Sequence, residues 1–416
     1  MTSGPYSDVA RGGTSIASSV ADVAEPQSGR IVMSTSQEIK LLSVLTGANF
    51  IVMTCINMLA PLLLELSTEF NTSVGAVGQL AAASAVPWAA LAPFMGMLSD
   101  RHGRRPVLSL GLVLLGLATI GSAFAWSYNS LLVFRLIGGI GGATTGPNLL
   151  SAPADYFPPH RSGRAMGFVL GGLSVATVIG VPAVAIMAAF VGWRAAFFIV
   201  GLLLVALGGI IWRSLPPKGK KASKSGMISG FATVLSSKTT LLLLIANLLE
   251  RSSFVATSTY LAAFLMQSYG LRLDEVAPVL SIIAVGTLLG SIFGGRLADR
   301  GRQRLQYSAL LLITAVLVFP VFAATPGLVT TAALAAGFGV FGSLARPAWL
   351  WLVTRVPAER RATTMGFAAT SNQTGIVVGS ALGGVLVGFG GYHLVGLLAA
   401  GAAVFSAVFC SLSGRK

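Results

Sequence analysis

Residues 96–108 (GMLSDRHGRRPVL) concentrate charge between two long apolar runs, in a chain where only 10% of the 416 residues are charged. A related stretch, GRLADRGR, occupies residues 295–302. Asp100 and Asp299 differ in position by 299 − 100 = 199, and the same offset relates further pairs along the chain: Phe94 and Phe293, Arg101 and Arg300, Gly180 and Gly379, Gly192 and Gly391. One offset over about a hundred residues indicates two copies of one unit in the same direction.

The composition indicates that this chain lies in a lipid bilayer. It is 54% hydrophobic, contains 50 glycines and has a mean hydropathy of +0.81, which excludes an ordinary soluble domain. The net charge of +15 comes from short basic clusters between apolar runs, so it indicates membrane topology rather than nucleic-acid binding. Cys55 and Cys410 lie in apolar spans of different halves. We therefore predict no disulfide, no metal site and no cofactor.

Apolar runs long enough to cross a bilayer predict twelve transmembrane helices. The predicted fold is an all-α membrane protein with two parallel six-helix repeats. Its parts are a disordered tail (1–40), a first bundle (41–213), a polar linker (214–238) and a second bundle (239–413). Met33, just before the first span, is a second candidate for the initiator.

Basic residues fall on alternate connections and predict the orientation of the chain. The predicted cytoplasmic connections contain the arginines near residues 101, 161, 300 and 360 and the lysines near residue 220, whereas the opposite connections have few basic residues. Both termini are then cytoplasmic, and we expect a multi-pass protein of the bacterial inner membrane.

The charged stretch also carries a family resemblance. Residues 96–107 resemble the loop between the second and third helices of the major facilitator superfamily, with the pattern Gly-x-Leu-Ala/Ser-Asp-Arg-x-Gly-Arg-Arg/Lys, and residues 295–304 resemble its weaker second copy. The resemblance covers roughly residues 40–412. It implies the major facilitator fold, in which two bundles rock around a central site, and it is nearest in pattern to twelve-helix proton antiporters that export drugs or sugars.

The same stretch predicts a gate. Asp100 is placed to cap a neighbouring helix or to pair with nearby arginines, and such bonds would exist only when the cytoplasmic side is closed. The candidate gating residues are Gly96, Asp100, Arg101, Gly103, Arg104, Arg105, Asp155, Arg164, Asp299 and Arg300. The alternative is that these charges serve only to orient the helices.

Four charged residues fall inside predicted spans, namely Arg135, Glu250, Arg251 and Arg346. A charge at the bilayer centre costs about 2.5 to 3.5 kcal/mol on insertion scales, so each needs a partner or a wet cavity. Glu250 is the one carboxylate placed deep in a span, and with Arg251 it is our candidate for proton coupling. The resemblance adds Arg135, because RLIGGIGGA at residues 135–143 is similar to a superfamily stretch associated with proton coupling or cavity polarity. The alternatives are a static ion pair at Glu250 and a helix-packing role for Arg135.

Polar residues within spans mark a candidate substrate cavity. Asn247, Glu250, Arg251 and Phe254 recur at three- and four-residue spacings, which places them near one face of a helix. The cavity candidates are Asn57, Asn148, Asn247, Arg346, Asn372 and Gln373. For each of them, a packed interface between helices is the alternative.

Gly180 and Pro182 predict a bend in the fifth span, because proline removes a helix hydrogen bond. The segment resembles a loose form of the Gly-Pro motif of antiporters.

Together these patterns predict a secondary transporter that exports a small organic solute, a drug or a sugar, by proton antiport and alternating access. The expected partners are a small-molecule substrate, protons and the lipid bilayer, with no nucleic acid, and the expected state is a monomer. Import or facilitated diffusion is the alternative. A non-transporting sensor on the same fold is an alternative from another class. A membrane enzyme is excluded, because the three histidines lie near predicted surfaces and form no cluster with a nucleophile.

Overall fold

The computed structural model describes residues 34–157, 159–216, 237–355 and 358–414, and this part of the chain is helical with no strands. The first half contains α1 (Thr35–Asn57), η1 (Ala60–Leu62), α2 (Leu63–Glu69), α3 (Val74–His102), α4 (Arg104–Ala123), α5 (Tyr128–Tyr156), α6 (Pro159–Val175), η2 (Ala176–Gly180), α7 (Val181–Val191) and α8 (Trp193–Ser214). The second half contains α10 (Lys238–Tyr269), α11 (Leu273–Ala298), α12 (Gln303–Ala323), α13 (Leu328–Thr354), α14 (Ala358–Gly390) and α15 (Tyr392–Leu412). Residues 1–33 of the predicted tail and most of the linker lie outside the described residues. The predicted end of the disordered tail at residue 40 is wrong, because α1 begins at Thr35, where Ser34 caps the helix.

The structure contains a helix or a continuous run of helices for each of the twelve predicted spans. The first span is α1 continued by η1 and α2, and the fifth is α6, η2 and α7 in sequence. By length and apolar composition, eleven helices of the described part are able to cross a membrane. The helix left out is α5, which contains Arg135 and Asn148. It contacts α3, α4 and α6 as the fourth helix of its bundle.

Capping residues explain where several helices begin and end. Ser73 accepts a hydrogen bond from the backbone nitrogen of Ala76 at the start of α3, and Ser237 does the same for Thr240 in α10. Gly103 separates α3 from α4 with a φ of +91°, a backbone conformation that glycine adopts without steric cost. This single residue therefore lets α4 begin directly after α3.

The two halves repeat the same hydrogen bonds between helices. Ser109 Oγ of α4 donates to the carbonyl oxygen of Gly208 in α8 at 2.7 Å. Ser308 Oγ of α12 donates to the carbonyl oxygen of Ala407 in α15 at 2.9 Å. Both residues of the second pair follow those of the first by 199 positions (308 − 109 and 407 − 208). The duplication predicted from the sequence is therefore confirmed by equivalent contacts in space.

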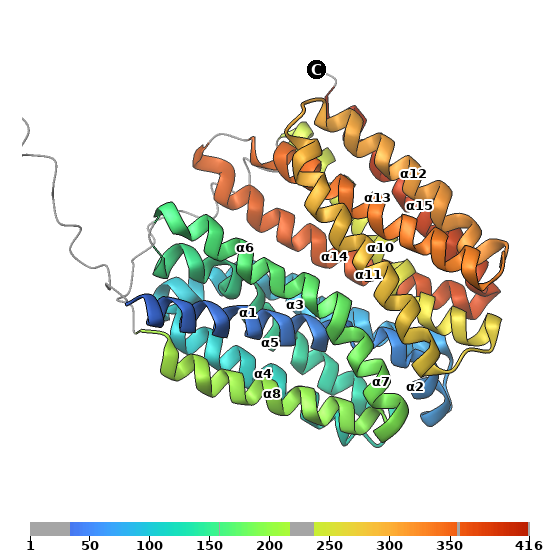
Figure 1. The fold of residues 1–416 in the computed structure, drawn as a ribbon, viewed down its shortest axis with the longest axis horizontal. Coiled ribbons are helices and arrows are strands. Elements are labelled where there is room, and N and C mark those ends of the chain that lie inside the picture. Colours follow the sequence, from blue (N-terminus) through green and yellow to red (C-terminus); the bar gives the residue numbers. More distant parts are fainter. Residues whose placement is uncertain (1–33, 158, 217–236, 356–357, 415–416) are drawn as a thin grey trace, which may run out of the picture.

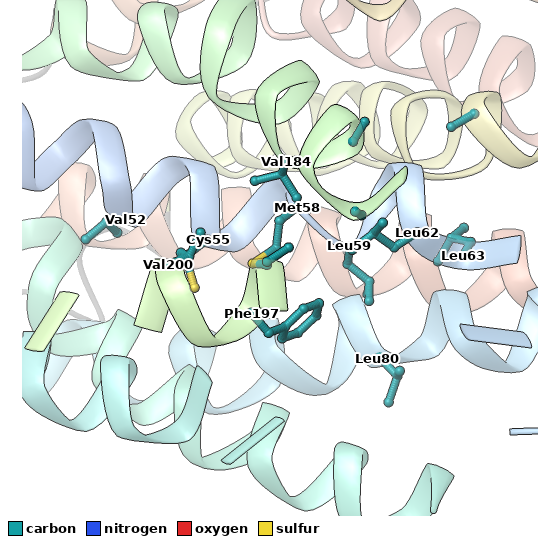
Figure 2. Close-up of a cluster of buried hydrophobic side chains, with 14 of the residues drawn as sticks. Val52, Cys55, Met58, Leu59, Leu62, Leu63, Leu80, Val184, Phe197 and Val200 are labelled. Carbon is teal, nitrogen blue, oxygen red and sulfur yellow. The ribbon is translucent and has the colours of Figure 1, made fainter. Parts of the chain in front are cut away.

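The buried apolar side chains form a first, larger core that extends from the first half into the second, and a smaller core within the second half. The outer helix faces are apolar as well. Figure 2 shows part of the first core, where Val52 and Cys55 of α1 lie beside Phe197 and Val200 of α8. Large apolar side chains such as Leu110 and Val316 point outward and are exposed. Helices with apolar outer faces, whose backbone groups bond within each helix, fit a lipid environment.

The two halves lie side by side (Figure 1) and contact each other mainly through α3 with α14 and through η2 and α7 with α11. The backbones approach closely where α3 begins and α14 approaches its end, since a Cβ atom on Gly75 would overlap the carbonyl oxygen of Gly384. Tyr260 of α10 lies between Gly78 and Gly383 nearby. We call this region the glycine contact. It lies at the opposite end of the bundle from Gly103.

A π-helical turn interrupts the fifth span at the position where a bend was predicted. Residues Ala176–Gly180 form η2, and Pro182 occupies the first turn of α7 directly after it. A Cβ atom on Gly180 would overlap the hydroxyl of Thr54 in α1. Glycine therefore allows this irregular turn to lie against α1.

Candidate transport site

The most concentrated group of charges among the described spans surrounds Glu250 of α10. Its side chain is only 5% exposed. Arg251 approaches it with two nitrogens: Nε donates to Oε2 at 2.7 Å, and Nη2 donates to Oε1. This two-point bond between a guanidinium and a carboxylate satisfies both carboxylate oxygens from within α10.

Arg346 extends the group to two further helices. From α13, its Nη1 donates to Oε2 of Glu250 at 3.1 Å, and its Nη2 donates to Oδ1 of Asn372 in α14 at 2.9 Å. Its side chain is 38% exposed, whereas that of Arg251 is 15% exposed. Arg346 is therefore the charged member of the group with the most open surface.

Aromatic residues hold the guanidinium of Arg251 in place. Its Cζ lies 4.7 Å from the centre of the Phe254 ring, one helical turn further along α10. Phe254 stacks on Phe338 of α13, with ring centres 5.9 Å apart and an angle of 19° between the planes. A guanidinium on an aromatic face gains a cation–π interaction, so one face and one edge of Arg251 are fixed.

The site carries one negative and two positive side chains, so its formal charge is +1 when all three are ionised. Of the described residues, none accepts a hydrogen bond from Nη1 of Arg251. We call Glu250, Arg251, Arg346 and Asn372 the charged cluster. It joins α10, α13 and α14, and sequence spacing on α10 alone could not have revealed the contributions from the other two helices.

The other predicted cavity residues lie elsewhere. Asn247 Nδ2 donates to Ser371 Oγ at 3.1 Å, between α10 and α14, and is buried. Asn148 accepts a hydrogen bond from Arg104, and Asn57 bonds to its own helix at the Met53 carbonyl oxygen. Gln373 is buried, and its Oε1 has no partner in the described part of the chain. Their roles as substrate ligands stay predictions.

Arg135 lies in the first half, apart from the charged cluster. It is 7% exposed, and its Cζ lies 5.1 Å from the centre of the Phe197 ring. Its Nε and Nη2 atoms are buried without an acceptor in the part of the chain that the structure describes. Its predicted part in proton coupling is untested.

The predicted gating residues lie at the ends of α3, α5 and α11 and at the starts of α4 and α6. Arg104 Nη1 donates to Oδ1 of Asn148 in α5 at 2.7 Å, and Arg105 lies over the Trp212 ring at 4.7 Å. Arg101, Asp299 and Arg300 are exposed. The surroundings of Gly96 and the side chains of Asp100, Asp155 and Arg164 lie outside the part that the structure describes. The gate therefore stays a prediction.

Sequence reasoning did not select Tyr260 or Tyr307. Tyr260 is fully buried and donates to the Ser380 carbonyl oxygen at 2.6 Å, at the glycine contact. Tyr307 of α12 is within 2.8 Å of Ser406 Oγ, behind the charged cluster. A tyrosine in an apolar span is a weak signal by itself, because its ring suits both a core and a cavity.

Two six-helix halves with a charged cluster between membrane-spanning helices define a polytopic membrane transporter rather than an enzyme. The profile of the Major Facilitator Superfamily matches residues 45–272 and 243–415. The chain therefore belongs to the major facilitator superfamily, and it transports a solute across a membrane.

Three known proteins illustrate the similarity. The inner membrane transport protein YdhP of Escherichia coli (strain K12) is 27% identical over 350 residues, covering 83% of this chain and 88% of that protein. A chloramphenicol resistance protein of Streptomyces lividans is 28% identical over 247 residues, 58% of this chain and 62% of that protein. The crystal structure of a bacterial homologue of the human lysosomal transporter Spinster, inward-facing and occupied, has a TM-score of 0.76 at 20% identity, covering 92% of this chain and 98% of that one.

Proposed function

We propose that the protein is a proton-coupled secondary transporter of a small organic solute in the bacterial inner membrane, with Glu250 as the group that carries the proton. The observation that carries this proposal is a buried carboxylate bonded to two arginines from different helices. A carboxyl group that exchanges its arginine partners for a proton would change the contacts between α10 and α13. Such a change gives a rocking bundle two alternative arrangements.

Export in exchange for protons is the first candidate direction. It is supported by the similarity to a chloramphenicol resistance protein and by the interrupted helix before Pro182. In this scheme, the lysine-rich linker and both termini face the cytoplasm. Proton binding must then weaken substrate binding. This requires a solute that binds more tightly when Glu250 is ionised.

Uptake together with a proton is the second candidate direction, and one observation favours it. The charged cluster has two guanidiniums for one carboxylate, so protonation of Glu250 leaves two positive charges without a counter-charge. A negatively charged solute would then bind more tightly when the proton is bound. Positive linkage of this kind is the signature of co-transport.

Transport in proteoliposomes tests the proposal. Purified protein is reconstituted with an imposed pH gradient, and the flux of a panel of small organic solutes is compared with and without that gradient. We expect gradient-driven flux for the wild type and none for Glu250→Gln. Glu65→Gln is the matched control, because Glu65 is the same residue type in α2, far along the chain from the charged cluster. Gradient-driven flux that survives in Glu250→Gln would remove Glu250 from the coupling step.

A further inference from the structure

We infer that the solute carries a carboxylate or a similar small anionic group, which binds Arg346 and Arg251 when Glu250 is protonated. This inference rests on the proposed role of Glu250 and deepens it by naming the substrate class. It also decides between the two candidate directions, because an anion that replaces the Glu250 charge moves together with the proton.

The first argument is charge. Within the described spans, Glu250 is the carboxylate that contacts both arginines, so the cluster keeps one positive charge uncompensated. A buried charge without a counter-charge costs several kcal/mol in general. Protonation of Glu250 raises the charge of the site to +2, and an anionic ligand returns it to +1, whereas a neutral ligand leaves it at +2 and a cationic ligand raises it to +3.

The second argument is the geometry of the donors. The guanidinium of Arg346 uses Nη1 for Glu250 and Nη2 for Asn372, and its side chain is 38% exposed. Arg251 is fixed on the Phe254 ring with its Nη1 edge unused by the described residues. Guanidinium forks match the two oxygens of a carboxylate, so the cluster presents preorganised donors for an anionic group.

The third argument is that a solute carboxylate can replace the Glu250 carboxylate at the same donors. The bonds that Glu250 receives are those that a solute carboxylate would receive, so the two carboxylates compete for the same donors. Protonation of Glu250 adds a proton to one of its carboxyl oxygens and removes its negative charge. The arginine donors are thereby released to the solute, and the site with bound solute carries the same charge of +1 that the empty site carries when Glu250 is ionised.

Thermal unfolding of the purified full-length protein tests the inference. The probes are 3-phenylpropionate and benzoate, each compared with its uncharged amide, 3-phenylpropanamide and benzamide. We expect the carboxylates to raise the melting temperature in a concentration-dependent way, more at pH 6 than at pH 8, while the amides do not. Arg346→Gln should weaken carboxylate binding about ten- to a hundredfold, and Arg346→Lys should weaken it less.

Glu250→Gln gives a readout that a merely structural role would not produce. It removes the competing charge, so we expect tighter carboxylate binding that no longer depends on pH. Arg272→Gln is the control, because Arg272 is exposed and pairs with Asp274 at the start of α11. Equal stabilisation by amides and carboxylates, no stabilisation by any carboxylate, or unchanged binding in Arg346→Gln would overturn the inference.

The outcomes separate this inference from the proposed function. Carboxylate binding without gradient-driven flux in proteoliposomes would overturn proton-coupled transport and leave the anion site in place. Gradient-driven flux of a neutral solute, with no binding of either carboxylate, would overturn the anion site and leave proton-coupled transport in place.

Discussion

The two halves of the protein share their helix packing but not their polar interiors. Asn49 of α1 donates to the Val169 carbonyl oxygen at 2.7 Å, and Asn247 of α10 donates to that of Ala368 at 3.4 Å. These residues correspond under the repeat to within one position (247 − 49 = 198, 368 − 169 = 199). The pair of asparagines therefore belongs to the packing of each half, which makes a packing role for Asn247 the simpler interpretation.

The charged cluster has no counterpart in the first half. Shifting back by 199 positions, Glu250 corresponds to Ile51, Arg251 to Val52 and Arg346 to Pro147. In that region the Trp88 ring packs against Gly142 and Gly146 of α5. The comparison teaches that duplication preserved the packing contacts while the ionisable groups diverged.

The largest expected effect comes from making the second half resemble the first. Glu250→Leu leaves two guanidiniums without their carboxylate, so we expect the free energy of unfolding to fall by about 3–5 kcal/mol. Ile51→Leu, at the equivalent position, should cost less than about 1.5 kcal/mol. Denaturant unfolding in detergent micelles measures both. Equal losses of unfolding free energy in the two variants would show that Glu250 contributes no more to stability than the apolar residue at the equivalent position of the first half.

The next effect concerns the interface between the halves. Gly75→Ala places a methyl group against the Gly384 carbonyl oxygen, and overpacking of this kind costs about 1–3 kcal/mol. Gly47→Ala in α1 is the matched control, since a Cβ atom there meets nothing within 4 Å. The melting temperatures of the two variants provide the measurement. If Gly75→Ala lowers the melting temperature no more than Gly47→Ala does, the close contact of α3 with α14 is contradicted.

A smaller effect tests the shared packing directly. Ser109→Ala and Ser308→Ala each remove the equivalent hydrogen bond, worth about 1 kcal/mol, and Ser308→Ala also removes the 2.9 Å hydrogen bond between Ser308 Oγ and Ser411 Oγ, so we expect it to cost up to about twice as much. Because the sites lie in different halves, the effects should add in the double variant. Denaturant unfolding of the three variants tests this. If one serine costs several times more than the other, the two interfaces are not energetically equivalent.

The smallest effect is expected at Arg135. Its buried nitrogens lack acceptors in the described residues, so Arg135→Met should change the free energy of unfolding by less than about 1 kcal/mol. The control is Leu334→Met at the equivalent position of the second half (135 + 199 = 334). A loss of about 3 kcal/mol or more in Arg135→Met, measured by the same unfolding, would indicate a strong charge partner for Arg135 and narrow the difference between the halves.

The helices were predictable because their signals are local. An apolar run of sufficient length has to cross the bilayer as a helix, which satisfies its backbone groups internally. Apolar length predicts spans at 193–213 and 328–353, and these lie within one residue of α8 and α13. Polar content lowers the apolar signal of α5, where Arg135 and Asn148 lie, although the uncharged run after Arg135 is still long enough for its span to be predicted with the others.

The sequence by itself determined the two-halved membrane fold, its offset of 199 and the scarcity of charge that drew attention to Glu250. Only the tertiary structure decided which polar side chains meet. Helical periodicity gives the face of α10 on which Glu250 lies, but not the helix that lies opposite. Arg346 is 96 residues away, and its bond to Glu250 depends on how α13 and α14 pack against α10. Close packing is a property of the assembled helices, so the charged cluster could be described only after folding.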